Sequence, residues 1–98
     1  MTEAVYRTKL KDKLRTKLPG CFIIENDPRV NQGVPDLLIL FKKRWGALEL
    51  KASSKSRKRP NQQYYVDLFN DMSYASFIHP KNEEQVLHDL QLSLGASR

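Results

Sequence analysis

The sequence of 98 residues is 40% hydrophobic and 29% charged, with a formal net charge of +6, which fits one compact domain with a thin core. It contains no apolar run near the roughly 20 residues of a membrane span, and its N-terminus lacks the apolar stretch of a secretory signal. Because the single cysteine, Cys21, excludes an internal disulfide and a cysteine-based zinc site, we expect one domain, residues 1–98, in a reducing intracellular compartment such as the cytoplasm.

The first element is predicted to be a helix with one apolar stripe. Apolar side chains recur every four residues, at Tyr6, Leu10, Leu14 and Leu18, with Val5 beside them. Thr2 is expected to cap this helix, and the pair at 19–20, Pro-Gly, to end it. The same helix carries a cluster of basic residues: Arg7, Lys9, Lys11, Lys13, Arg15 and Lys17. This cluster is either a phosphate-binding patch or a solvated helix face.

Two strands and a turn are predicted next. Residues 21–25 form a short strand, and residues 28–34 form a loop after the break at Asn26-Asp27-Pro28. Residues 35–41 are nearly all apolar after Asp36, as in a central strand covered on both faces. The polar stretch 42–46 contains one glycine and is expected to be the turn of a hairpin.

The partner strand of that hairpin, residues 47–51, alternates apolar and charged side chains. Leu48 and Leu50 are expected on one face, and Glu49 and Lys51 on the other. Residues 51–60 carry five basic residues and no acid, and without them the chain has 12 basic against 11 acidic residues. We name Lys55, Arg57, Lys58 and Arg59 the basic loop. It is either a phosphate-binding segment or a soluble, flexible loop.

The remaining elements alternate helix, strand and helix. Pro60 is placed to open a helix, whose apolar face would come from Tyr64 or Tyr65, Leu68, Phe69 and Met72. Residues 74–78 read as a fourth strand. Asn82 and Gln85 resemble a capping box before a helix with the stripe Val86, Leu87, Leu90 and Leu94. The order α-β-β-β-α-β-α predicts an α/β domain with a mixed four-stranded sheet.

Three ionisable residues fall where a sheet is expected to be apolar. Asp36 opens the most hydrophobic strand, and Glu49 and Lys51 lie about 7 Å apart on one face of its partner. Burying such charges costs several kcal/mol unless they are paired or bind a metal. Two carboxylates suit a hard cation such as magnesium, and a lysine can stabilise charge that develops on a phosphate. The alternatives are that Asp36 only accepts backbone hydrogen bonds and that the other two residues form an exposed pair on an edge strand.

The same residues resemble a known family signature. Pro35-Asp36, twelve intervening residues and Glu49-Leu50-Lys51 resemble the PD-(D/E)xK motif of the restriction-endonuclease-like nucleases. The stretch 33–37, Gly-Val-Pro-Asp-Leu, and Pro60-Asn61-Gln62 are similar to the VRR-NUC branch, whose stand-alone members are typical of bacteriophages. The resemblance covers about residues 3–94 and implies an αβββαβ core with a C-terminal helix.

The resemblance also implies a role for each matching residue. Asp36 and Glu49 would be ligands of Mg²⁺ (or Mn²⁺), together with the backbone carbonyl of Leu50. Lys51 would position and activate the attacking water, and Gln62 would hold the lysine, the water or the scissile phosphate. Glu3 matches the acidic residue of the family's first helix, which reaches the metal directly or through water. For Gln62 the adjacent Gln63 leaves the register open, and Glu3 is equally consistent with an acid that favours the helix dipole.

These observations lead to one functional prediction with alternatives. We expect a magnesium-dependent DNA endonuclease, a phosphodiester hydrolase, that prefers branched DNA such as four-way junctions, with the basic loop contacting the backbone. We also expect a homodimer that uses the helix from Pro60 and the last helix, because two symmetry-related sites suit paired cuts. A phage-encoded protein would act in the host cytoplasm. The alternatives are a non-selective or end-processing nuclease and a catalytically idle nucleic-acid-binding module.

Overall fold

The computed structural model describes residues 1–96 and contains the seven elements in the predicted order. They are α1 (Glu3–Lys17), β1 (Phe22–Glu25), β2 (Leu37–Phe41), β3 (Arg44–Leu50), α2 (Pro60–Met72), β4 (Tyr74–Ile78) and α3 (Glu83–Ser93). The strands form one sheet in the order β1-β2-β3-β4. β1 and β3 run antiparallel to β2, and β4 runs parallel to β3. The predicted α/β class with a mixed four-stranded sheet is therefore confirmed.

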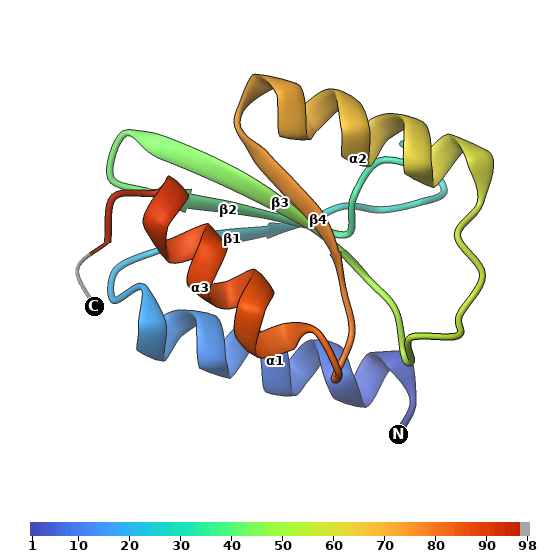
Figure 1. Cartoon of the computed structure of the whole chain (residues 1–98), viewed down its shortest axis with the longest axis horizontal. Coiled ribbons are helices and arrows are strands. Elements are labelled where there is room, and N and C mark those ends of the chain that lie inside the picture. Colours follow the sequence, from blue (N-terminus) through green and yellow to red (C-terminus); the bar gives the residue numbers. More distant parts are fainter. Residues whose placement is uncertain (97–98) are drawn as a thin grey trace.

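The sheet lies between two helical layers. Figure 1 shows α2 on one side of the sheet and α1 with α3 on the other. The predicted stripe of α1 is confirmed, because all four of its residues are buried in the larger core together with Leu48 and Leu50. α1 begins as predicted, since Thr2 Oγ1 accepts a hydrogen bond from the N–H of Val5 at 3.2 Å. A smaller cluster under α2 contains Ala47, Val66, Ala75 and Phe77.

The hairpin between β2 and β3 is tighter than predicted. Its turn consists of Lys42 and Lys43 alone, and Lys42 has a positive φ of 57°. Gly46, expected in the turn, lies inside β3 and pairs with Ile39 of β2. A Cβ atom at position 46 would lie 2.5 Å from Cδ1 of Leu90. The glycine is therefore required for the close approach of α3 to the sheet.

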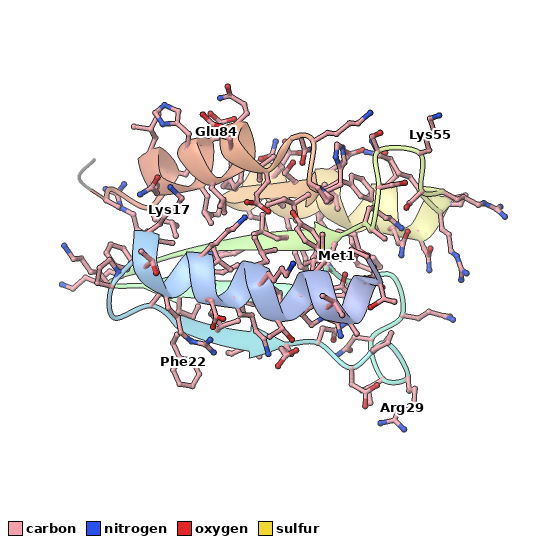
Figure 2. The ribbon with its side chains drawn as sticks, turned by 90° about the horizontal axis from the view of Figure 1, so that it is seen from below. Met1, Lys17, Phe22, Arg29, Lys55 and Glu84 are labelled. Atoms are coloured by element: carbon pink, nitrogen blue, oxygen red, sulfur yellow. The ribbon has the colours of Figure 1, made fainter. Side chains whose placement is uncertain are left out.

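β2 is fully covered on one face only. Leu37, Ile39 and Phe41 are buried, whereas Leu38 and Leu40 on the α2 side are half-buried. α2 packs against β3 and β4 and leaves part of this face open. Figure 2 shows Phe22 of the edge strand β1 projecting away from the body of the protein. The prediction of a strand covered on both faces was therefore wrong in part.

Three expectations about the helices also need correction. In α2 the buried residue is Val66, while Tyr64 and Met72 are 61% and 62% exposed. Asn82 makes no capping box; its Oδ1 accepts from the N–H of His79 at 2.8 Å and so closes the turn after β4. The homodimer prediction also assumes that the leucines of α3 outnumber what one sheet face needs, but the predicted stripe is entirely buried within the chain. Only Leu92 of this helix, 50% exposed, is left for contact with a partner. No helix of residues 1–96 is long and apolar enough to cross a membrane.

Candidate active site

Antiparallel pairing brings Asp36 next to the end of β3. Leu37, the first residue of β2, pairs with Leu48, so the preceding Asp36 lies beside residues 49 and 50. The Asp36 carboxylate accepts a hydrogen bond at Oδ2 from the backbone N–H of Leu50 at 2.9 Å. This bond anchors one oxygen of the carboxylate to β3. The expectation that Asp36 accepts a backbone hydrogen bond and the expectation that it faces Glu49 are thus compatible.

Glu49 and Lys51 share the face of β3 that α2 covers. β3 lies between β2 and β4, and the two residues are only 4% and 8% exposed. They are therefore not an exposed pair on an edge strand, which removes that alternative. Two ionisable side chains this deep require partners, because the cost of removing them from water is several kcal/mol each.

Gln62 supplies a partner to each of them. Its Oε1 accepts from Nζ of Lys51 at 2.7 Å and from the backbone N–H of Arg59 at 3.1 Å, and its Nε2 donates to Oε2 of Glu49 at 3.2 Å. The amide thus presents its acceptor to the ammonium and its donor to the carboxylate. Gln63 is exposed and donates to Asp67 instead. The sequence left open whether Gln62 or Gln63 faces the site, and in the structure it is Gln62.

The environment of Glu49 disfavours its charged form. The pKa of Glu49 is raised from 4.5 to about 8, chiefly by burial and next by the charge of Asp36 and a hydrogen bond with it, while the nearby Lys51 acts in the opposite direction. Glu3 contributes a smaller effect that also raises this pKa. In the protein without a cation, a proton on Glu49 relieves the repulsion at neutral pH. A bound divalent cation would relieve it equally well.

The oxygen atoms of the site fit magnesium if water and phosphate oxygens complete its ligand shell. Within residues 1–96 no group of three or more His, Cys, Asp or Glu side chains is gathered closely enough to hold a metal ion. Asp36, Glu49 and the Leu50 carbonyl offer oxygen atoms alone, and Mg²⁺ typically takes one or two carboxylates and completes its shell with water and phosphate oxygens. Glu3 is exposed in the first turn of α1. Its role as a ligand stays a prediction.

Arg7 of α1 also lies at the site, although the sequence did not predict it there. Its Nη2 lies 3.9 Å from Oδ1 of Asp36, at the oxygen that does not bond to β3. From the sequence, Arg7 was expected only as one of the basic residues of α1. The spacing in the sequence could have indicated this position. Arg7 lies four residues after Glu3, a candidate site residue, and so shares its side of the helix. The arginine gives Asp36 a cationic neighbour in the structure.

The two basic clusters differ in how their charge is balanced. On α1, Lys11, Lys13 and Arg15 form ion pairs with Glu25, Glu83 and Asp12. All members of the basic loop are exposed, and no ion pair within residues 1–96 involves them. The basic loop therefore carries the less compensated positive charge, and it directly precedes the helix that bears Gln62.

Comparisons with known proteins give no match: no family model fits the sequence, and neither the curated proteins nor the solved structures contain a similar chain.

Proposed function

We propose that the protein is a metal-dependent DNA endonuclease of the PD-(D/E)xK type, with a restriction-endonuclease-like core of the VRR-NUC branch. The observation that carries the proposal is the cluster at the end of β3, in which Glu49 and Lys51 are buried and Asp36 and Gln62 are half-buried. In it the two carboxylates crowd each other, and one amide bridges glutamate to lysine at 3.2 and 2.7 Å. A structural role alone gives no reason to keep two repelling carboxylates in a core.

Each residue has a defined part in phosphodiester hydrolysis. Asp36 and Glu49, with the Leu50 carbonyl, would hold Mg²⁺ or Mn²⁺, which when bound polarises a phosphoryl oxygen and lowers the pKa of a coordinated water. Lys51, held in place by the Oε1 of Gln62, orients the attacking water and stabilises negative charge on the phosphate. Gln62 therefore acts by positioning the lysine and the glutamate.

DNA is the substrate that the charge favours. The chain carries a net charge of +6, and its uncompensated basic loop connects β3, which bears the site, to α2. Contacts of this kind bind phosphates without reading bases. We therefore place selectivity in DNA shape, with four-way junctions as the preferred substrate and a homodimer as the form that makes paired cuts. The resemblance to stand-alone phage enzymes makes the cytoplasm of a bacterial host the proposed place of action.

The test is cleavage of matched duplex, single-stranded, flap and four-way-junction DNA, with Mg²⁺, with Mn²⁺ and with EDTA. The wild type should cut in the presence of either metal, most rapidly at the junction, and should be inactive in EDTA. Asp36→Asn and Glu49→Gln should be inactive while still binding DNA. Asp71→Asn removes an exposed carboxylate near the far end of α2 and should cut like the wild type. Cleavage by Asp36→Asn at the wild-type rate would refute the proposal.

A further inference from the structure

A surface groove lies directly beside the proposed active site. It has a volume of about 300 Å³ and is lined by Ala52, Ser53, Ser54, Lys55, Pro80 and Lys81. Its walls are the segment that follows β3 and the turn that follows β4. The backbone N–H of Lys51 donates to the carbonyl of Ile78 at 2.8 Å, which joins the two walls at their base. Figure 1 shows both segments leaving the same end of the sheet, close to the N-terminus of α1.

Both walls of the groove are ordered turns. In the first, the N–H of Ser53 donates to Oγ of Ser56 and the N–H of Ser56 donates to the carbonyl of Ser53, each at 3.2 Å. In the second, the N–H of His79 donates to Oδ1 of Asn82 at 2.8 Å, and the N–H of Asn82 donates back to the carbonyl of His79 at 3.2 Å. The groove is thus formed before any ligand arrives, which lowers the entropic cost of binding.

The groove is positively charged without compensation. Lys55 and Lys81 line it, while Lys58 extends over Phe77 of β4, with its Nζ 4.8 Å from the ring centroid. Burial lowers the pKa of His79, and the charges of Lys58 and Lys81 lower it further. No ion pair within the described part of the chain involves any of the three lysines.

Hydrogen-bond donors accompany these charges. Ser53 and Ser54 line the groove, and a serine hydroxyl can donate to an anionic oxygen. The Ser53 Oγ accepts from the N–H of Lys55 at 3.2 Å and lies 3.4 Å from Oγ of Ser56. Lysines combined with hydroxyl groups around a small open groove match the charge and the acceptors of a phosphate group. Figure 2 shows Lys55 projecting outward from the wall toward solvent.

We infer that this groove binds one backbone phosphate of the DNA strand, next to the phosphate that is cut. The inference rests on the proposed function and adds a second phosphate site to it. Lys51 faces the active site, and the chain that follows it, residues 52–55, lines the groove. A strand whose scissile phosphate lies at Lys51 therefore continues over the groove. A phosphate held there fixes the register of the strand without reading a base.

The first experiment combines DNA in which one phosphate is neutralised with protein variants in which the lysines of the groove are replaced. Binding is measured in EDTA, so no cleavage is needed, with DNA carrying one neutral methylphosphonate at successive positions. The wild type should lose affinity strongly at one position beside the cut site, and the double variant Lys55→Gln/Lys81→Gln should be insensitive at that position. The matched control Lys42→Gln/Lys43→Gln removes the same charge at the distant hairpin turn and should keep the wild-type pattern. Equal responses of wild type and Lys55→Gln/Lys81→Gln at every position would overturn the inference.

A second experiment separates the groove from the nuclease proposal. Inorganic phosphate is titrated while the backbone amide signals are followed by NMR. The amides of Ser53, Ser54 and Lys81 should shift in the wild type and the control, and should not shift in Lys55→Gln/Lys81→Gln. Saturable shifts without DNA binding would assign the groove to free phosphate, overturning the DNA source and the proposed function together. Position-specific binding of uncleaved DNA would support the groove even if cleavage were never observed.

Discussion

The raised pKa of Glu49 makes a direct prediction about stability in the absence of metal. A carboxyl group whose pKa is higher in the folded than in the unfolded state stabilises the fold fully below the unfolded value. That contribution is lost as the pH rises through the folded value. For Glu49 these values are 4.5 and about 8. The free energy of unfolding should therefore fall between pH 4.5 and pH 8.

The magnitude follows from the size of the shift. One pKa unit corresponds to about 1.4 kcal/mol, so the shift of Glu49 from 4.5 to about 8 predicts a loss on the order of 5 kcal/mol. This is a large part of the 5–15 kcal/mol typical of a folded domain. Urea unfolding in EDTA at a series of pH values measures it. Glu49→Gln stays neutral throughout and should flatten the curve, whereas Glu84→Gln, the same change at an exposed residue, should not.

Magnesium should reverse this loss at neutral pH. A cation held by both carboxylates binds the folded state alone, and at 100 times its Kd it adds about 2.7 kcal/mol of stability. Asp36→Asn should remove the repulsion beside Glu49 and also abolish the Mg²⁺-dependent rise in Tm. The reasoning fails if Glu49→Gln keeps the wild-type dependence on pH, or if Mg²⁺ stabilises Asp36→Asn as much as the wild type.

Three further predictions concern activity, binding and assembly. Asp36→Asn, Glu49→Gln and Lys51→Ala should each lower cleavage by orders of magnitude, and the triple variant should be little worse than the singles, because the residues act as one unit; additive losses in single-turnover rates would contradict this. Replacing the four cations of the basic loop by serine should lower the slope of log affinity against log salt by roughly 0.9 per lost phosphate contact. An unchanged slope would mean that the loop is only solvated. If the protein is a homodimer, as proposed, light scattering should give about twice the chain mass of 11.4 kDa; a monomer mass with and without junction DNA would refute the proposal.

The periodicity of the sequence predicted most of the fold. A four-residue spacing placed Leu10 and Leu14 in the core, and alternation placed Leu48 and Glu49 on opposite faces of β3. Both patterns follow directly from backbone geometry. Gly46 could not be assigned in this way. A glycine in a polar stretch indicates a turn. In the structure, Gly46 is required because a Cβ atom there would collide with Leu90, 44 positions later in the chain. Only the packing of α3 on the sheet reveals it.

The site was predictable to the extent that it lies on one hairpin. Asp36 and Glu49 approach each other through the pairing of β2 with β3, which sequence order and strand polarity already indicate. Alternation could not decide whether Glu49 is buried, because that depends on α2 and on β4 beside it. Arg7 comes from a helix on the opposite side of the sheet, and its distance to Asp36 depends on how far α1 extends past the strand ends.

In the proposed nuclease, the connection from β3 to α2 links the chemistry to DNA binding. It contains the basic loop and the start of α2, and the hydrogen bond from the N–H of Arg59 to Oε1 of Gln62 fixes how the helix begins. Pro60 stands at the first helical position, where its fixed φ favours this register. A start shifted by one residue would turn Gln62 away by about 100° of helical rotation and leave Lys51 and Glu49 without their shared partner. The short segment that we propose to present cations to the phosphates therefore also holds the lysine and the glutamate in place.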